Sequence, residues 1–119
     1  MNNKKHSQRQ EHNVADWISL VDPTAYRVNN SGAPDFKCGD VASNYILLEC
    51  KTKAEPQKQQ ILHKKWLEKI KEEAYVKDVP LSGAVVDFGI DGEDYYIVDK
   101  HDFINLLDAY IKMKEEENE

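Results

Sequence analysis

The stretch "GDVASNYILLECKTK", residues Gly39–Lys53, decides the fold expected for this chain of 119 residues. Its apolar residues from Tyr45 to Cys50 predict a buried β-strand, which two charged residues, Glu49 and Lys51, interrupt. Side chains alternate across a strand, so Glu49 and Lys51 are expected on one face and Cys50 on the other. Burying a carboxylate and an ammonium is costly unless each has a partner, so both charges need an explanation.

Hydrophobic patterns outside this stretch predict the remaining elements. Helical spacing predicts helices over about residues 8–20, 56–75 and 101–113. Pro56 suits the first turn of the second helix, and Asp99 suits the N-cap of the third. Strands are predicted over residues 25–28, 40–43, 44–50, 81–90 and 94–98. The order helix, three strands, helix, two strands, helix predicts an α/β fold with a mixed β-sheet flanked by helices.

The length and composition indicate one domain over residues 1–119, with residues 1–7 and 114–119 expected to be flexible ends. No apolar run approaches the ~20 residues of a membrane span, and the polar start lacks the apolar stretch of a secretory signal. The sequence therefore predicts no membrane partner and a cytoplasmic location. Its two cysteines are too few for a disulfide scaffold and do not form a C-x-x-C pair.

Charge is distributed unevenly along the chain, whose net charge is −6. Residues 1–71 hold 12 Lys and Arg against 8 Asp and Glu, a net of +4, whereas residues 72–119 hold 4 against 14, a net of −10. The half that contains the charged strand is therefore basic, and a polyanionic partner is not excluded.

Two further carboxylates are expected near the charged strand. Asp40 starts the preceding β segment, and an antiparallel return brings it alongside Glu49. Glu11 lies on the apolar side of the first helix and could supply a third carboxylate. Three carboxylates repel one another unless a cation binds them, and oxygen ligands favour a hard ion such as Mg²⁺. Lys51 beside them would orient a water or stabilise an anionic transition state, which suits phosphodiester hydrolysis.

A plainer interpretation stands beside this one. Glu49 and Lys51 also fit a surface ion pair of little energetic value, and Asp40 after a glycine fits a turn. Glu11 would then lie on the polar side of a slightly rotated helix. The occurrence of all four in one short chain, next to a lysine-rich helix, favours the site.

These residues resemble the PD-(D/E)xK nucleases, and within them the small branch of archaeal-type and phage Holliday junction resolvases. The resemblance covers about residues 8–108. It rests on these segments, in order: "QEHNVADWI" (10–18), "NNSGAP" (29–34), "GDVASNYILLECKTK" (39–53), "QQILHKKWLEKIKEEA" (59–74), "GAVVDFG" (83–89) and "YYIVDKHDF" (95–103).

The resemblance implies a restriction-endonuclease-like mixed sheet and a metal site at its motif residues. Asp40 and Glu49 would be metal ligands, with the backbone carbonyl of Cys50 as a further ligand. Lys51 would be the catalytic lysine and Glu11 an accessory metal-site carboxylate. The sequence Pro34-Asp35-Phe36 also imitates the motif, so Asp35 stays open as an alternative to Asp40, which adjoins a strand and is preferred because metal ligands need rigid elements.

The activity implied by the resemblance is that of a Mg²⁺-dependent endodeoxyribonuclease, with Mn²⁺ able to substitute. Branched DNA of the Holliday junction type, in recombination or repair, is the first expected substrate, and duplex DNA is the second. A homodimer is also implied, in the cytoplasm of a bacterial, archaeal or phage-infected cell.

DNA binding would depend on lysines, because the chain has only two arginines. Lys53 and Lys58 directly follow the site and are the expected phosphate contacts, together with Ser31, which the resemblance places in the binding loop. Two other function classes remain. One is a non-catalytic nucleic-acid-binding or assembly module with the same fold, and the other is an acidic regulator that binds a basic protein through residues 87–119.

Overall fold

The computed structural model describes residues 3–28, 39–53, 55–89 and 93–118. Ser31 and Asp35, two of the predicted site residues, lie outside this part of the chain. The described elements are α1 (Asn3–Ser19), β1 (Tyr26–Arg27), β2 (Val41–Ala42), β3 (Ile46–Lys51), α2 (Lys64–Lys77), β4 (Leu81–Val86), β5 (Tyr95–Val98) and α3 (Lys100–Glu117). The predicted order of helices and strands is confirmed.

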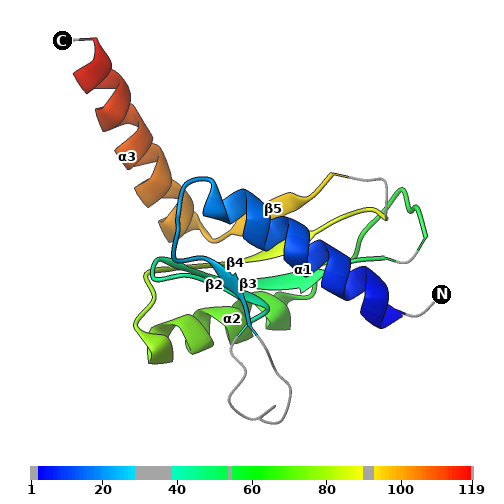
Figure 1. Ribbon diagram of the computed structural model, residues 1–119. Coiled ribbons are helices and arrows are strands. Elements are labelled where there is room, and N and C mark those ends of the chain that lie inside the picture. Colours follow the sequence, from blue (N-terminus) through cyan, green and yellow to red (C-terminus); the bar gives the residue numbers. More distant parts are fainter. Residues whose placement is uncertain (1–2, 29–38, 54, 90–92, 119) are drawn as a thin grey trace.

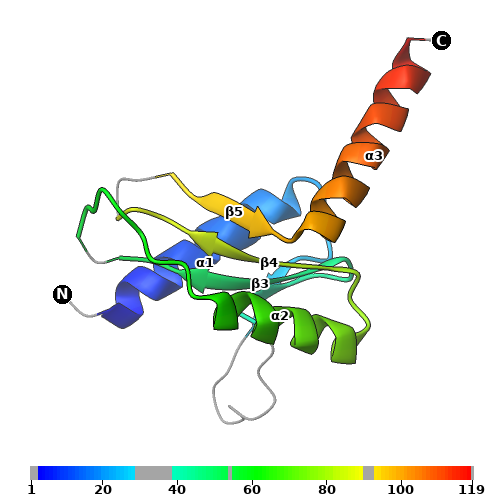
Figure 2. The same ribbon diagram turned by 180° about the vertical axis from the view of Figure 1, so that it is seen from behind.

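The strands form one mixed sheet in the order β1-β2-β3-β4-β5, in which only the β3–β4 pair is parallel. Parallel neighbours need a crossover connection, and α2 supplies it. The two opposite views show α1 across one face of the sheet and α2 across the other (Figures 1 and 2). The third helix, α3, projects away from the sheet (Figure 1).

The core consists of one layer on each side of the sheet. Between the sheet and α1 the buried residues are Val14, Ala15, Val41, Leu48, Cys50 and Val85. Between the sheet and α2 they are Ala42, Leu47, Ile70 and Ala74. The expected alternation of β3 is therefore present, with Leu48 and Cys50 toward α1 and Leu47 toward α2. Glu49 and Lys51 follow Leu47 at strand spacing and share its side.

The second helix begins later than predicted, at Lys64 instead of about residue 56. The preceding segment is tied to the end of β4 instead of forming a helical turn. The backbone N–H of Gln57 donates to the carbonyl of Phe88 at 2.6 Å, and Nε2 of Gln60 donates to the carbonyl of Asp87 at 2.8 Å. These long-range hydrogen bonds outweigh a weak local helical preference.

The terminal helices are longer than expected. The first begins at Asn3, and the third continues to Glu117, through residues expected to be flexible. Asp99 caps α3 as predicted, because its side chain accepts the backbone N–H of Asp102 at 2.9 Å. Within the described residues, no helix combines the length and apolarity needed to cross a membrane.

Candidate active site

Asp40 and Glu49 meet at the β2–β3 pair. The register pairs Val41 with Leu48, which places Asp40 opposite Glu49. Asp40 is only 4% exposed, and its carboxyl group is hydrogen-bonded to that of Glu49. Oδ2 of Asp40 also accepts the backbone N–H of Cys50 at 2.8 Å, so β3 fixes the orientation of the carboxyl group.

The Glu49 carboxyl group has an unusual proton affinity. Burial, the negative charge of Asp40 and the hydrogen bond to Asp40 raise the pKa of Glu49 to about 7, against the opposing effects of Lys51 and Lys69. The Glu49 carboxyl group therefore keeps its proton up to near-neutral pH when no cation is bound.

The ammonium group of Lys51 lies beside this pair. Its Nζ is 3.6 Å from Oε1 of Glu49 and 4.8 Å from the centre of a ring of Trp66, which belongs to α2. A cation over an aromatic face is attracted by the ring quadrupole, so Trp66 helps to hold the lysine. Trp66 is half-buried, and its ring also lies 4.6 Å from the ring of His63.

Gln10 fixes the backbone at the end of β3. Its side chain is 1% exposed, and Nε2 donates to the carbonyl of Lys51 at 2.8 Å and to that of Val85 at 3.4 Å. One amide thus joins α1 to the ends of β3 and β4. Sequence reasoning missed Gln10, although it precedes Val14 by four residues and so shares its buried side.

Asp87 anchors the chain just beyond β3. This carboxylate is buried and accepts the hydroxyl of Thr52 at 2.8 Å, the backbone N–H of Lys53 at 3.3 Å and that of Gly89 at 3.1 Å. Arg9 adds an ion pair at 3.8 Å. These contacts fix the residues that follow β3 against those that follow β4.

Glu11 lies on α1, where its carboxylate is 3.4 Å from Arg27 on β1. It is close enough to Cys50 to contribute, after burial and Asp40, to the raised pKa of that thiol. Within the part of the chain that the structure describes, no group of three acidic, histidine or cysteine side chains could hold a metal ion. The structure thus brings together two of the three predicted carboxylates, Asp40 and Glu49, and pairs the third with an arginine.

The donor set at the pair suits a hard cation. Asp40 and Glu49 are held in contact, and the pKa of Glu49 is raised, so a divalent ion that replaces the proton of Glu49 would relieve the repulsion between the two carboxylates. Their oxygens, with the backbone carbonyl of Cys50, are ligands of the kind that Mg²⁺ accepts. Glu11 stands on the α1 side of the same strands as a further carboxylate.

Further lysines are candidate phosphate contacts. Lys53 and Lys58, the predicted ones, are both exposed. Lys69, on α2, is close enough to lower the pKa of Glu49. The lysine-rich second helix therefore adds a positive charge beside the acidic pair.

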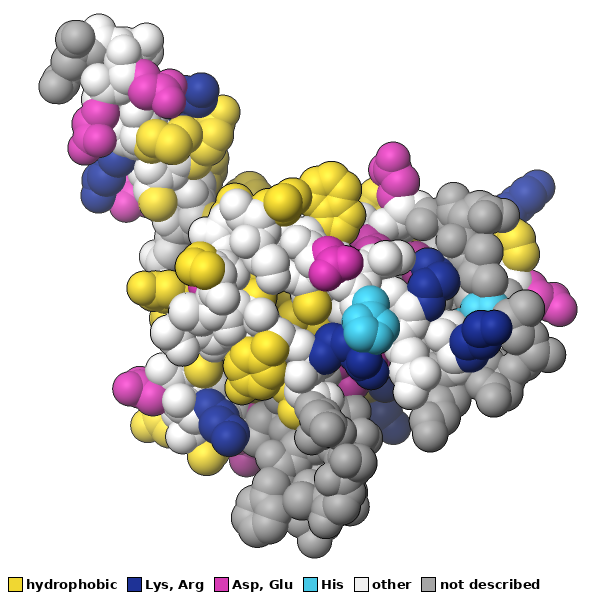
Figure 3. Space-filling model, viewed as in Figure 1, with side chains coloured by type: hydrophobic (Ala, Val, Ile, Leu, Met, Phe, Trp, Pro, Cys, Tyr) yellow, Lys and Arg dark blue, Asp and Glu magenta, His cyan; other side chains and the backbone are white. Residues whose placement is uncertain are grey.

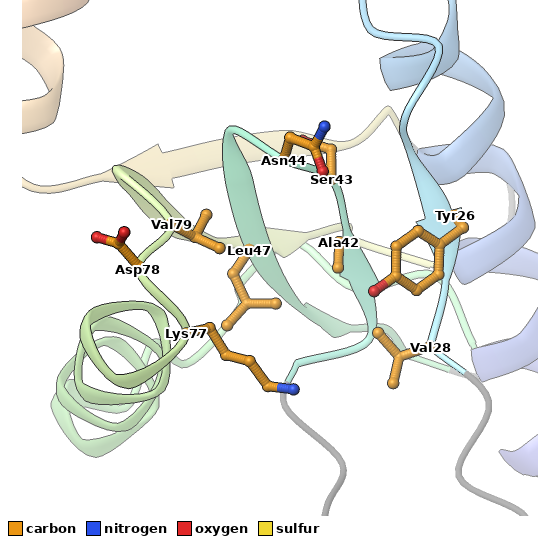
Figure 4. A pocket seen from close by; sticks show the side chains of 9 residues that line it. All are labelled: Tyr26, Val28, Ala42, Ser43, Asn44, Leu47, Lys77, Asp78 and Val79. Carbon is orange, nitrogen blue, oxygen red and sulfur yellow. The ribbon is translucent and has the colours of Figure 1, made fainter.

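The pocket in Figure 4 lies apart from these groups. It has a volume of about 410 Å³ and is lined by Tyr26, Val28, Ala42, Ser43, Asn44, Leu47, Lys77, Asp78 and Val79. Leu47 and Val79 point into it, whereas the carboxylate of its acidic residue, Asp78, points away (Figure 4). None of the paired catalytic candidates lines it, so we assign no chemistry to this pocket.

Comparisons with protein-family models, with curated proteins and with solved structures find no match for this chain. The candidate site therefore depends on its own geometry: an acidic pair, an adjacent ammonium and a rigidly held strand end.

Proposed function

We propose that this chain is a metal-dependent DNA endonuclease that hydrolyses phosphodiester bonds at Asp40, Glu49 and Lys51. One observation supports the proposal above all others. The carboxyl groups of Asp40 and Glu49 are in contact, and the Lys51 ammonium lies 3.6 Å from Glu49.

Each residue has a distinct part in the proposed reaction. Asp40 and Glu49, with the carbonyl of Cys50, would hold Mg²⁺, or Mn²⁺ in its place. The bound ion would supply Lewis-acid polarisation of the phosphate and a more acidic water. Lys51 would contact a non-bridging phosphate oxygen and stabilise the negative charge that develops there.

The surroundings of the pair support a nucleic-acid substrate. Lys51 and Lys69 add positive charge close to it, Lys53 and Lys58 are exposed further along the chain, and neutralised phosphates release counterions from DNA. Branched DNA of the Holliday junction type is the proposed substrate. A homodimer would present one such site to each of two strands.

The test uses a synthetic four-way junction and a linear duplex of the same sequence, each with Mg²⁺, with Mn²⁺ or with EDTA. We expect cleavage of the junction only with a divalent ion. Asp40→Asn, Glu49→Gln and Lys51→Met should each lower the cleavage rate by about 100-fold or more, because each removes a group that acts on the transition state.

Glu72→Gln is the matched control, since it makes the same change at an exposed position of α2. It should cut as fast as the parent. Circular dichroism should be unchanged in all four variants, and junction binding should be unchanged in Asp40→Asn, Glu49→Gln and Glu72→Gln. If Glu49→Gln cuts at the parental rate, the site is assigned wrongly.

The same assay separates the alternative functions. Retained junction binding without cleavage under any divalent ion would favour a non-catalytic nucleic-acid-binding module. No DNA binding even at low salt would favour an acidic regulator. Replacing Lys53 and Lys58 by Ala should flatten the salt dependence of binding, because each lost phosphate contact lowers the slope by about one.

A further inference from the structure

A second cavity lies between the end of α1 and the start of β5. It has a volume of about 380 Å³, which is within the range of ~300–1,000 Å³ typical of small-molecule sites. The described residues that line it are Trp17, Ile18, Glu93, Asp94 and Tyr96. In Figure 3, hydrophobic and acidic side chains lie next to one another over the region where Figure 1 shows α1 beside β5. The cavity therefore combines aromatic side chains with carboxylates.

The aromatic part of the lining comes from two different elements. Tyr96 of β5 pairs with Val85 of β4, and residues paired across two strands lie on the same face of the sheet. Val85 belongs to the core layer between the sheet and α1, so Tyr96 faces α1 and its Trp17. Trp17 is 67% exposed and Tyr96 is 41% exposed, so both rings can be reached by a ligand. The faces of such rings attract organic cations.

The acidic part of the lining includes a partly buried charge. Burial and the charge of Asp87 raise the pKa of Asp94, and the hydrogen bond from Gln10 and the charge of Arg9 oppose this only in part. The charge of Asp94 in turn contributes, after burial, to the pKa of Tyr96, which is raised to about 12. Asp94 is therefore a partly desolvated carboxylate close to Tyr96. A cation bound in the cavity would stabilise its ionised form.

This combination of groups favours a guanidinium group as the ligand. A guanidinium group is planar and always charged, stacks on aromatic rings and donates two parallel hydrogen bonds to a carboxylate. An ammonium group has neither the plane nor the paired donors. A phosphate would meet Glu93 and Asp94, which carry charge of its own sign, so the cavity does not extend the proposed DNA-binding surface.

We propose that the cavity between α1 and β5 binds a guanidinium group, which stacks against Trp17 and Tyr96 and pairs with Asp94 and Glu93. An arginine side chain of a partner protein and a free guanidinium compound both carry this group. The site acts without DNA or metal, so its test is separate from that of the proposed nuclease.

NMR spectra of the nitrogen-15-labelled chain, without DNA or divalent ions, measure the binding. The chain has two tryptophans, and Trp66→Phe identifies which indole N–H signal belongs to Trp17. We expect N-acetylarginine amide to shift the Trp17 signal, and not that of Trp66, with a dissociation constant on the order of 1 mM, as for a small ligand with few contacts.

Two further ligands define the chemistry that is recognised. N-acetylcitrulline amide has the same shape without the charge, and it should bind at least about 10-fold more weakly. Agmatine carries the guanidinium group on a free small molecule. Tighter binding of agmatine than of N-acetylarginine amide would indicate a free compound as the ligand, and the reverse would indicate an arginine side chain.

Substitutions in the lining test the assignment of the site. Asp94→Asn should weaken binding of N-acetylarginine amide by about 10-fold, and Glu93→Gln, at an exposed position, by about 3-fold. Trp17→Leu should weaken it by about 5-fold, measured at the backbone N–H of Tyr96. Asp16→Asn is the matched control, because Asp16 is exposed on α1 and does not line the cavity, and it should bind like the parent.

Circular dichroism and thermal unfolding check that each variant folds, and Glu93→Gln tests the site if Asp94→Asn does not fold. Equal shifts with the arginine and citrulline compounds overturn the proposal. So does the absence of a saturable shift of the Trp17 signal up to about 20 mM ligand, where a site of the expected affinity is nearly full. Binding that both acidic substitutions leave unchanged also overturns it.

Discussion

The ring of Trp66 lies 4.8 Å from Nζ of Lys51, so the helix that crosses over the sheet restrains an ammonium group supplied by the strand beneath it. The same ammonium lies 3.6 Å from Oε1 of Glu49. The Lys51 ammonium is thereby held between the Glu49 carboxylate and the face of Trp66, so both residues determine its position.

Replacing Trp66 should therefore loosen Lys51 without removing it. A cation–π contact at a partly exposed site is worth about 0.5–1 kcal/mol, so Trp66→Leu should lower kcat by about 2–5-fold with little change in KM. Trp66→Phe, which keeps an aromatic face, should recover part of the loss. Single-turnover cleavage of the junction measures the rate of the chemical step in the two variants and the parent. Equal rates for the leucine variant and the parent would show that the ring does not position the lysine.

Gln10→Ala should affect both stability and cleavage. The substitution leaves the carbonyls of Lys51 and Val85 without the buried amide, which should lower the free energy of unfolding by about 1–3 kcal/mol. Urea denaturation measures this change, and kcat should fall because the end of β3 moves. Gln8→Ala, the same change at an exposed position of α1, is the control. If both variants lose a similar free energy of unfolding, helix propensity is responsible and not the hydrogen bonds of the Gln10 side chain.

The stability of the metal-free protein should depend on pH through Glu49. Its pKa is raised from 4.5 to about 7 in the folded protein, so the folded state binds the proton more tightly than the unfolded state. This contribution is fully present below pH 4.5 and is lost as the pH rises to about 7. Glu49→Gln removes it, so the variant should lose less stability than the parent between pH 5 and pH 8. Urea denaturation in EDTA at both pH values checks this, and equal losses in the two proteins would contradict it.

Gly39→Ala should destabilise the protein next to Asp40. Gly39 has a φ of 70°, a conformation that costs an alanine about 1–2 kcal/mol. An added Cβ would also lie 3.0 Å from the side chain of Leu47. Thermal unfolding should show a lower midpoint, and Gly39→Asn should recover part of it because asparagine tolerates this φ. If asparagine is no better than alanine, crowding and not backbone strain dominates.

Much of the fold follows from local pattern in the sequence. The alternation of Leu47 and Leu48 between the two core layers is what a strand period of two requires. The meeting of Asp40 and Glu49 follows from the same period and an antiparallel turn, since both act within one short stretch of chain.

The parts that sequence reasoning missed depend on contacts between distant segments. The start of α2 is displaced by hydrogen bonds from Gln57 and Gln60 to the end of β4, which no local periodicity encodes. The restraints on Lys51 come from Gln10 and Trp66, on two different helices. The spacing of Gln10 from Val14 indicates that this glutamine is buried, but it does not indicate that its side chain donates to the carbonyl of Lys51 on β3.

The contact between Asp40 and Glu49 and the restraint on Lys51 should form at different stages of folding. Asp40 directly precedes β2 and Glu49 lies on β3, and residues 43–45 join these two strands in a short loop that closes at little entropic cost. The hydrogen bond from Gln10 to the carbonyl of Lys51 joins residues 41 apart in the sequence, so it forms only when α1 packs on the sheet. If α1 detaches transiently, Asp40 and Glu49 should stay together while the end of β3 that carries Lys51 loses its hydrogen bond to Gln10. Hydrogen exchange along α1 would detect this reversible opening.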